Sequence, residues 1–503
     1  MKELGRQGLS AFFWGAGGSI FKIILQLGTQ AILARLLGPT EYGLFALGVI
    51  VVTLGAFFSD IGLAYGLIQK KLVSPNDIQF VWTWQCILGL SISSAIFFCA
   101  GMLASFFSEP DAEFIFQWLS LVILINALTA PATNLLRKNL NYKALQVSQL
   151  SSYFIGFGCI GIPLAIAGYD AASLVTAWLV HSVLNFIFLY LQVRHSLSFR
   201  LWSADGSFML RYGATVLGTN LINWLLNMAD KILIGRVFPA YTLGLYNTAF
   251  NLVYSPSYAI YGNLQSVVFS AGARLQDNHE ALRAVFLHLL SLIILTAFPF
   301  FAIIGVGSEF VMVTVYGIEW LEASQFLMPF ALVMPFLMIW GISTPILWNS
   351  GHTKLEFRLQ IPLVLLWMVT FYSVADLPPQ VIAIVAASLF ALRCMVMVLA
   401  VTYILKISFW SFLQAVQGGI ALTLIVSIVS ALLVPSIAAL ETDASVQLLL
   451  LLSVAGIVYI LSVYLFAPLL VDARLSAYTS QISDRLPPWM KPILRRIFGE
   501  YKK

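Results

Sequence analysis

Charge is what this sequence has least of. Only 10% of the 503 residues are charged and 60% are apolar, whereas a soluble domain carries roughly 25% charged residues. Most of the surface must therefore face something other than water, which excludes a soluble globular protein. The net charge of +5 gives no reason to expect nucleic-acid binding, because the basic residues follow a topological pattern described below.

Residues that bind metals or carry out catalysis are also scarce. The five histidines form no HxxxH or HExxH pattern, and no phosphate-binding glycine loop or nucleophile elbow is found. Cysteines are few, all lie within apolar runs, and none has metal-ligand spacing; they are Cys86, Cys99, Cys159 and Cys394. We therefore predict no cofactor, no metal site and no enzymatic activity.

Long apolar runs are what the sequence has in abundance. A membrane-spanning helix needs about 20 mainly apolar residues, and runs of that length recur from end to end. We predict an all-α polytopic membrane protein with about fourteen spanning helices. The predicted spans are 9–36, 45–67, 80–107, 114–136, 147–168, 173–194, 212–238, 245–270, 284–305, 324–349, 357–374, 381–405, 411–434 and 446–467.

The distribution of lysine and arginine predicts the orientation of these spans. If the N-terminus is cytoplasmic, the inner segments hold 22 of the 27 basic residues, and the outer loops hold only Arg35 and Arg236. Basic residues concentrate in cytoplasmic loops, and one missed span would scramble the alternation. We therefore predict that both termini are cytoplasmic.

The C-terminal tail differs from the rest of the chain. Within 468–503, the stretch PPWMKPILRRIFGEYKK alternates apolar and basic residues. This pattern is typical of an amphipathic segment lying on an anionic inner leaflet. The alternative is a frayed basic tail.

An internal repeat organises the sequence. The first span ends in RLLGPTEYGLF from Arg35 and the seventh ends in RVFPAYTLGLY from Arg236, so the matched residues lie at a constant offset of 201. Parallel repeats flanking a midplane site are one architecture of secondary transporters. We predict two pseudo-repeated six-helix lobes and an added helix pair. The bounds are 1–194 for the N-terminal lobe, 195–211 for a cytoplasmic linker, 212–405 for the C-terminal lobe and 406–467 for the pair.

Matched polar stripes support the repeat. Polar residues spaced i, i+4, i+8 lie on one helix face, and the first span has such a set at Lys22, Gln26 and Gln30. Lys22 lies near the middle of its span, where facing lipid would cost at least about 2.5–3.5 kcal/mol. The seventh span repeats the spacing at the same offset, and the residues on or beside its stripe are Asn220, Asn223, Asn227, Asp230 and Lys231.

Intramembrane charges are the main candidate functional residues, because each is costly unless it is paired or functional. Besides those on the stripes, they include Asp60 in the second span and Arg393 in the twelfth. The structural alternatives are a static salt bridge for Lys22, contacts with the opposite bundle for Asp230 and Lys231, helix capping for Asp60, and anchoring for Arg393. Cations outnumber acids in this set, which favours an anionic ligand.

Four segments resemble a known family. ARLLGPTEYGLFAL (34–47), SDIGLAYGLIQ (59–69), LRKNLNYKAL (136–145) and SAGARLQDN (270–278) are similar to the oligosaccharide flippases. These are the Wzx-type polysaccharide transporters of the multidrug/oligosaccharidyl-lipid/polysaccharide exporter superfamily. The resemblance implies two six-helix lobes around a central cavity lined by the first and seventh helices. It also implies location in the bacterial inner membrane and a role in lipopolysaccharide or exopolysaccharide synthesis.

The substrate implied by the resemblance is an undecaprenyl-pyrophosphate-linked oligosaccharide, moved from the inner to the outer leaflet by alternating access. Lys22, Lys231 and Arg393 would then bind the pyrophosphate, and Asp60 or Asp230 would bind a coupling ion. The amides of the two stripes would bind sugar hydroxyls, namely Gln26, Gln30, Asn220, Asn223 and Asn227. Membrane lipids are further partners, and a polysaccharide polymerase or export machinery is compatible with the role.

Three rival functions remain open. A cation-coupled multidrug exporter should have an acid-rich cavity, whereas this set of charges is basic. A lipid II exporter should carry several arginines in its first helix, where Lys22 stands nearly alone. A polysaccharide polymerase or ligase needs a large outer loop with catalytic Arg or His, and the longest outer loop, roughly 306–323, contains neither.

Overall fold

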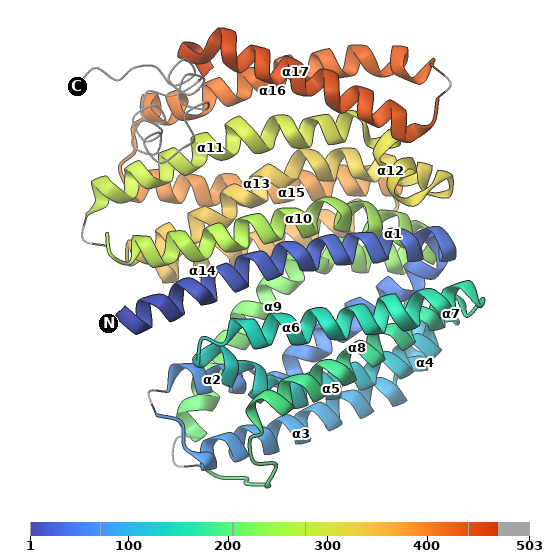
Figure 1. The fold of residues 1–503 in the computed structure, drawn as a ribbon, viewed down its shortest axis with the longest axis vertical. Helices are drawn as coiled ribbons and strands as arrows, with labels where there is room; N and C mark the ends of the chain where they lie inside the picture. The colour runs from blue at the N-terminus through green and yellow to red at the C-terminus, as the bar shows by residue number, and fades with distance from the viewer. Residues whose placement is uncertain (1, 71, 204–205, 277, 441, 471–503) are drawn as a thin grey trace. The chain divides into compact units, whose positions relative to one another are not determined.

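All the regular secondary structure in the part of the chain that the structure describes is helical. The computed structural model describes residues 2–470 except 71, 204–205, 277 and 441, so residues 471–503 of the predicted amphipathic tail lie outside it. Figure 1 shows the elements, which are α1 (Lys2–Asp60), α2 (Leu63–Gln69), α3 (Pro75–Phe98), α4 (Ala100–Phe107), α5 (Ala112–Lys138), α6 (Tyr142–Tyr153), the π-helix η1 (Phe154–Gly161), α7 (Ile162–Ile166), α8 (Asp170–Val193), α9 (Gly206–Val237), α10 (Ala240–Gly272), α11 (His279–Val306), α12 (Ser308–Tyr316), the 3₁₀-helix η2 (Ile318–Ala323), α13 (Ser324–Asn349), α14 (Thr353–Ser373), α15 (Pro379–Ile404), α16 (Phe409–Ala438) and α17 (Ala444–Leu470).

The helices confirm a polytopic membrane protein. Among the described residues, 11 helices are long and apolar enough to cross a membrane. The first of these, α1, is interrupted at Gly38, whose φ of 74° and ψ of 177° are not helical, so α1 covers two of the predicted spans. α9 and α10 occupy the places of the seventh and eighth predicted spans but are not among the eleven. The count of fourteen therefore stays a prediction.

The chain divides into two compact units. The first comprises Met1–Thr248 and Val364–Pro379, and the second comprises Ala249–Leu363 and Gln380–Lys503. The lobes predicted from the repeat, 1–194 and 212–405, divide the chain at a different point and remain a prediction. Both α1 and α9, the helices with the polar stripes, belong largely or wholly to the first unit.

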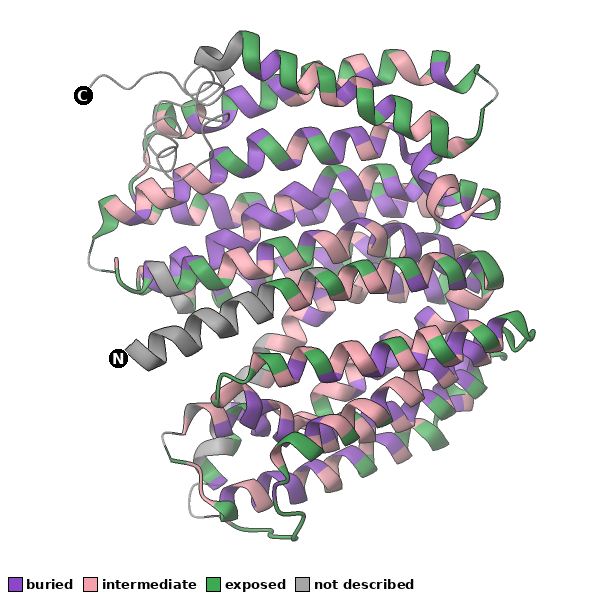
Figure 2. Ribbon diagram, viewed as in Figure 1, coloured by how far each residue is buried: buried purple, intermediate pink, exposed green. Residues whose placement is uncertain are grey.

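Small residues allow the helices of the first unit to pack closely. A Cβ on Gly55 of α1 would lie 2.5 Å from Ile123 Cδ1 of α5, and one on Gly89 of α3 would lie 2.8 Å from the Cβ of Ala127. Such glycines bring helix backbones together where the hydrophobic effect cannot drive association. Residues on the sides of the helices that contact other helices are buried. Residues on the uncovered sides are exposed (Figure 2).

The second unit contains the C-terminal helix pair. α16 packs against α11 and α17, and the three helices lie side by side in Figure 1. Gly419 of α16 sits directly against Ile294 of α11, since an added Cβ would lie 2.6 Å from the Ile294 carbonyl carbon. The residues of this core are Leu295, Ile303, Phe310, Leu422, Val426, Ile437, Leu451, Ala455 and Val463.

The segment after α8 is bound to the start of α3. Ser203 donates a hydrogen bond of 2.8 Å to Asp77, and the backbone amide of Arg200 donates one of 2.6 Å to Thr83. Asp77 also completes a capping box with Ser74 at the N-terminus of α3. The predicted linker, 195–211, is thus anchored to the first unit at its beginning.

A buried histidine strengthens this attachment. The His195 ring lies 5.4 Å from the Trp82 ring and 5.3 Å from the Tyr190 ring, measured between centroids. Burial lowers the pKa of His195 because it disfavours the charged imidazolium. The neutral ring therefore contributes aromatic packing between the linker, α3 and α8.

Candidate functional site

The two repeated segments touch each other within the first unit. A Cβ on Gly43 would overlap the carbonyl oxygen of Ala240, and a Cβ on Gly244 would overlap the carbonyl oxygen of Pro39. Gly244 and Ala240 are the repeat equivalents of Gly43 and Pro39 at the offset of 201. The contact is therefore reciprocal, as expected for two equivalent elements related by an approximate twofold axis.

Lys22 is a half-buried cation in a polar neighbourhood of the first unit. Its Nζ donates a hydrogen bond of 3.3 Å to Gln149 Oε1 of α6. About two helical turns further along α1, the hydroxyl of Thr29 forms a hydrogen bond of 2.9 Å with the hydroxyl of Tyr153 of α6. Among the described residues, no carboxylate is paired with Lys22. The site thus holds a positive charge that no acidic side chain of this part of the chain offsets.

The rest of the α1 stripe is available for hydrogen bonding. Gln26 and Gln30 are half-buried, and their backbone carbonyls accept from Thr29 and Tyr42. Their side chains follow Lys22 along one face of α1. Gln149, which sequence analysis missed, belongs to the same polar neighbourhood. Its role depends on a contact 127 positions away in the chain, for which a single sequence carries no signal.

Asp60 lies inside the second predicted span, 45–67, and is the last residue of α1; its carboxylate accepts hydrogen bonds from α2 and α3. Gln85 of α3 donates a hydrogen bond of 2.5 Å to Asp60 Oδ1, and the amide of Ala64 donates to the same oxygen at 3.4 Å. Directly afterwards, Gly62 has a φ of 69°, which a glycine adopts without strain. These contacts favour the capping interpretation over an open ion site.

The α9 stripe contains half-buried amides and a deeply buried pair of charges. Asn220, Asn223 and Asn227 are half-buried, and the Asn227 amide donates a bond of 2.6 Å to the Asn223 carbonyl oxygen. Further along, Asp230 and Lys231 are only 2% and 4% exposed. The polar stripe of α9 therefore ends in the interior of the first unit.

Asp230 and Lys231 offset each other's charge. They interact electrostatically, and Tyr246 donates a hydrogen bond of 2.7 Å to Asp230 Oδ2. Tyr246 lies in the repeated motif, so this bond ties the end of the stripe to the beginning of α10. The arrangement is a compensated buried pair, which is costly to break by removing one partner.

Arg393 lies in the interior of the second unit and is 1% exposed. Its Nη2 donates a hydrogen bond of 3.1 Å to Gln360 Oε1, and its guanidinium carbon lies 4.3 Å from the centre of the Trp340 ring. A cation over an indole face is favourable, especially when it is desolvated. Arg393 also interacts electrostatically with Glu356.

Glu356 is a functional candidate that sequence analysis missed. It is buried at the first turn of α14, and its carboxylate accepts hydrogen bonds from Trp348 at 2.5 Å, Gln360 at 3.1 Å and Thr344 at 3.3 Å. These donors satisfy an ionised carboxylate. The predicted span began at 357, one residue after Glu356, so the carboxylate was placed outside the membrane.

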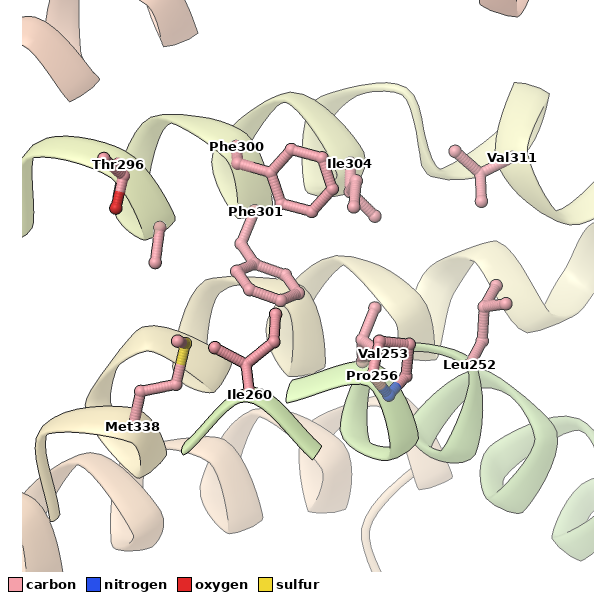
Figure 3. A pocket seen from close by; sticks show the side chains of 11 residues that line it. Leu252, Val253, Pro256, Ile260, Thr296, Phe300, Phe301, Ile304, Val311 and Met338 are labelled. Atoms are coloured by element: carbon pink, nitrogen blue, oxygen red, sulfur yellow. The ribbon is translucent and has the colours of Figure 1, made fainter. Parts of the chain in front are cut away.

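An apolar pocket of about 530 Å³ lies elsewhere in the second unit. Figure 3 shows α11 side chains, including Phe301, facing Ile260 of α10 and Met338 of α13. The pocket's hydroxyl-bearing residue, Thr296, donates to the Leu292 carbonyl oxygen of its own helix. Such a lining accommodates hydrocarbon, and it offers nothing that neutralises a phosphate.

Many lipid-compatible helices that enclose buried charges and polar stripes define a polytopic membrane transporter. In fold, the chain is similar to the lipid II flippase MurJ in an inward closed conformation, with a TM-score of 0.73. That alignment covers 90% of this chain and 98% of MurJ at 14% identity, so it shows the fold alone.

Sequence comparison identifies the family. The family described as "Polysaccharide biosynthesis protein" matches residues 32–325, which is more than half of the chain. The protein therefore belongs to the polysaccharide biosynthesis protein family, as the resemblance predicted.

Two curated relatives carry related names. The chain is 28% identical to the lipopolysaccharide biosynthesis protein WzxC of Escherichia coli over 62% of its length and 64% of that protein, so the match spans less than two thirds of WzxC. It is 21% identical to the teichuronic acid biosynthesis protein TuaB of Bacillus subtilis over 86% of its length and 89% of that protein. The two names refer to different polymers, so membership of the family does not specify one sugar.

Proposed function

We propose that this protein is a flippase that moves an undecaprenyl-pyrophosphate-linked oligosaccharide from the inner to the outer leaflet for surface polysaccharide synthesis. The polymer-related names of the family and of two relatives support the biosynthetic role. Similarity to the fold of a lipid II flippase supports movement of a lipid-linked substrate. Because fold alone does not fix function, the proposal depends on the chemistry of the site.

The observation that carries the proposal is the uneven compensation of the intramembrane cations. Lys231 lies beside Asp230, and Arg393 interacts with Glu356. Lys22 has no such carboxylate among the described residues, and its hydrogen-bond partner is the neutral Gln149. A half-buried, uncompensated ammonium attracts an anion, and a pyrophosphate would provide the missing negative charge.

The surroundings of Lys22 favour an anionic ligand more specifically than the total number of intramembrane charges does. The addition of Glu356 removes the excess of cations over acids in the set of candidate intramembrane charges, which then holds three of each: Lys22, Lys231 and Arg393 against Asp60, Asp230 and Glu356. A local excess of positive charge remains at Lys22. A cationic drug would be repelled there, so the site favours an anionic lipid headgroup over the substrate of a multidrug exporter.

The polar residues on both stripes suit the sugar portion of the substrate. Gln26 and Gln30 follow Lys22 on α1, and their amides can both donate to and accept from hydroxyl groups. The half-buried α9 amides Asn220, Asn223 and Asn227 have the same capacity. In this proposal the headgroup enters the protein while the polyprenyl chain stays in lipid, and alternating access moves the headgroup across.

Lys231, Arg393 and the coupling ion have more restricted roles in this proposal. Lys231 and Arg393 would reach the pyrophosphate only if their present contacts open, because both are buried. Asp230 is the better of the two candidate coupling sites, because protonation there would change the balance with Lys231. Asp60 instead carries contacts typical of a helix end.

The cellular setting follows from the same role. A lipid-linked repeat unit is completed at the cytoplasmic face, so the protein would lie in the bacterial inner membrane with both termini in the cytoplasm. The distribution of basic residues supports that orientation. A polysaccharide polymerase or export machinery would receive the flipped unit.

Deletion of the gene in the native host tests this function. We expect the loss of one surface polysaccharide, and accumulation of its lipid-linked repeat unit on the cytoplasmic leaflet, measured by protection from an impermeant periodate reagent. Sensitivity to cationic dyes should not change.

Two outcomes would contradict the proposal. Normal polysaccharide with new dye sensitivity would indicate a drug exporter. Repeat units that reach the outer leaflet but remain unpolymerised would indicate a polymerase or ligase. Complementation with the wild-type gene controls for effects on neighbouring genes.

A further inference from the structure

α10 carries a polar stripe of its own, distinct from the stripes of α1 and α9. Its members within the second unit follow one another at intervals of three and four residues, so they share one face of the helix. None of them is charged, and three are tyrosines. They are Asn251, Tyr254, Tyr258, Tyr261 and Gln265.

The opposite face of α10 is apolar. Leu252, Pro256 and Ile260 line the pocket of Figure 3. At about 100° of rotation per residue, these positions lie roughly on the other side of the helix from the tyrosines. One helix therefore separates a hydrocarbon-lined surface from a surface of amides and phenols.

The stripe lies at a depth where facing lipid would be costly. α10 has 33 residues, and Tyr258 is the nineteenth, about 27 Å along a helix of about 50 Å. Tyr258 is nevertheless 55% exposed. A hydroxyl and amides near the membrane centre are costly unless they reach water or polar partners. We therefore place this face toward a hydrated space and not toward lipid tails.

The aromatic rings of the stripe are held rigidly. Phe250 stacks on Tyr254 with 4.9 Å between centroids, Tyr254 is followed by Tyr258 at 5.8 Å, and Tyr258 meets Tyr261 edge-on at 5.2 Å. Tyr254 and Tyr261 also hydrogen-bond to each other. Tyr258 is thus the exposed member of a packed ladder.

The layer behind the ladder fixes it further. The Tyr261 ring packs onto the backbone of α13, because a Cβ on Gly341 would lie 2.6 Å from Tyr261 Cδ2. Next along α13, Trp340 lies under the Arg393 guanidinium. Rigid aromatic surfaces bind with little loss of conformational entropy. The Glu356–Gln360–Arg393 network therefore acts here as support for the stripe.

We propose that the α10 stripe is a sugar-binding surface of the protein, in addition to the amides of α1 and α9, and that Tyr258 stacks against a neutral pyranose ring. A pyranose has an apolar C–H face and a rim of hydroxyls. The Tyr258 ring suits the face. The amides of Asn251 and Gln265 each lie about 10 Å along the helix from Tyr258, so they suit the hydroxyls of neighbouring sugars in the oligosaccharide. This inference rests on the proposed function, since it adds a surface for the oligosaccharide on α10 and leaves the proposed role of Lys22 in pyrophosphate binding unchanged.

The test measures sugar binding separately from phosphate binding. Short oligosaccharides cut from the host's own surface polysaccharide are one probe, and inorganic pyrophosphate is the other. Both are titrated against purified protein in lipid nanodiscs, with saturation-transfer NMR for the sugar and ³¹P line broadening for pyrophosphate. The variants are Tyr258→Leu and Tyr258→Phe. The control is Phe300→Leu, because Phe300 is similarly exposed at 54% but lines the apolar pocket.

We expect Tyr258→Leu to weaken oligosaccharide binding about fivefold, and Tyr258→Phe and Phe300→Leu to bind it like the wild type. Pyrophosphate binding should be equal in all four proteins, which also shows that Tyr258→Leu is folded. Unchanged sugar binding in Tyr258→Leu overturns the inference, as does a wild type that binds pyrophosphate but no sugar. By contrast, pyrophosphate binding that persists in Lys22→Ala would overturn the proposed phosphate site and leave the Tyr258 result standing.

Discussion

Lys22 on α1 and Lys231 on α9 lie on polar stripes with the same spacing, yet the first unit surrounds them differently. Lys22 is half-buried and bonds to Gln149, whereas Lys231 is 4% exposed beside Asp230. Their positions are also not equivalent, because the repeat aligns Lys22 with Asn223 and Lys231 with Gln30. The two lysines therefore stand eight residues apart in the repeat frame, or about 12 Å along a helix.

The different surroundings of the two lysines predict different roles, namely anion binding for Lys22 and a contribution to stability for Lys231. A buried pair such as Asp230 and Lys231 is already neutral overall, so an incoming anion gains little from it. An ammonium without a carboxylate partner gains more from an anion, because both groups lose the cost of an unpaired charge. In the proposed function, the same repeated stripe would provide a ligand-binding charge in one half and two buried charges of opposite sign in the other.

The largest expected effect is the loss of transport on removing the Lys22 charge. Lys22→Ala should reduce surface polysaccharide in a complemented deletion strain by at least about tenfold, because a charge-assisted hydrogen bond to the substrate is lost. Lys22→Arg should retain part of the export, since it keeps the positive charge.

The matched control is Ile24→Ala, an exposed position on the opposite side of α1. It should export like the wild type at equal protein level on immunoblots. Normal export by Lys22→Ala would remove the distinction between the two lysines.

The second effect concerns the two buried charges of α9, Asp230 and Lys231. Asp230→Asn leaves Lys231 buried beside a neutral amide, and we expect this to destabilise the fold by about 3–5 kcal/mol. Asp230→Asn combined with Lys231→Met should lose less, because both charges are then absent. Thermal unfolding of the purified variants measures this, with Lys22→Ala expected to melt like the wild type.

A different result would change the assignment of Asp230. If Asp230→Asn melts normally but fails to export, the carboxylate works as the proposed coupling site and contributes little to stability. α1 and α9 would then differ in what they bind: Lys22 of α1 would bind the substrate, and Asp230 of α9 would bind the coupling ion.

The sequence allowed the stripes, the repeat and the family to be predicted, because each is a regularity along the chain. Helical spacing places Lys22, Gln26 and Gln30 on one face without reference to the rest of the fold. The positions of charges relative to helix ends were less accurate. Glu356 was excluded from the membrane by a span boundary, whereas α14 begins at Thr353.

The partners of the charged residues could not be predicted. Gln149 reaches Lys22 across 127 positions and Gln85 reaches Asp60 across 25, and no local pattern encodes such contacts. The spacing of the α10 stripe is a regularity of the sequence, but the rigidity on which its proposed role depends comes from the packing of Tyr261 against Gly341. Compensation of charge and rigidity of side chains are properties of tertiary packing, and the spacing of residues along the chain does not encode them.

The smallest expected effect tests whether the two halves meet symmetrically. An added methyl group at Gly43 or at Gly244 would overlap a backbone carbonyl, that of Ala240 or that of Pro39. Backbone cannot rotate away as a side chain can, so each substitution to Ala should destabilise the protein by about 1–3 kcal/mol, and by similar amounts. The double variant should lose less stability than the sum of the two single losses, because separating the two segments for one methyl group makes room for the other.

Gly28→Ala on α1 is the control, since a Cβ there meets nothing within 4 Å, and it should be neutral or slightly stabilising. Thermal unfolding of the four variants measures these differences. A large loss for Gly43→Ala alone would mean that the contact is one-sided and that the halves are related in sequence but not at this interface.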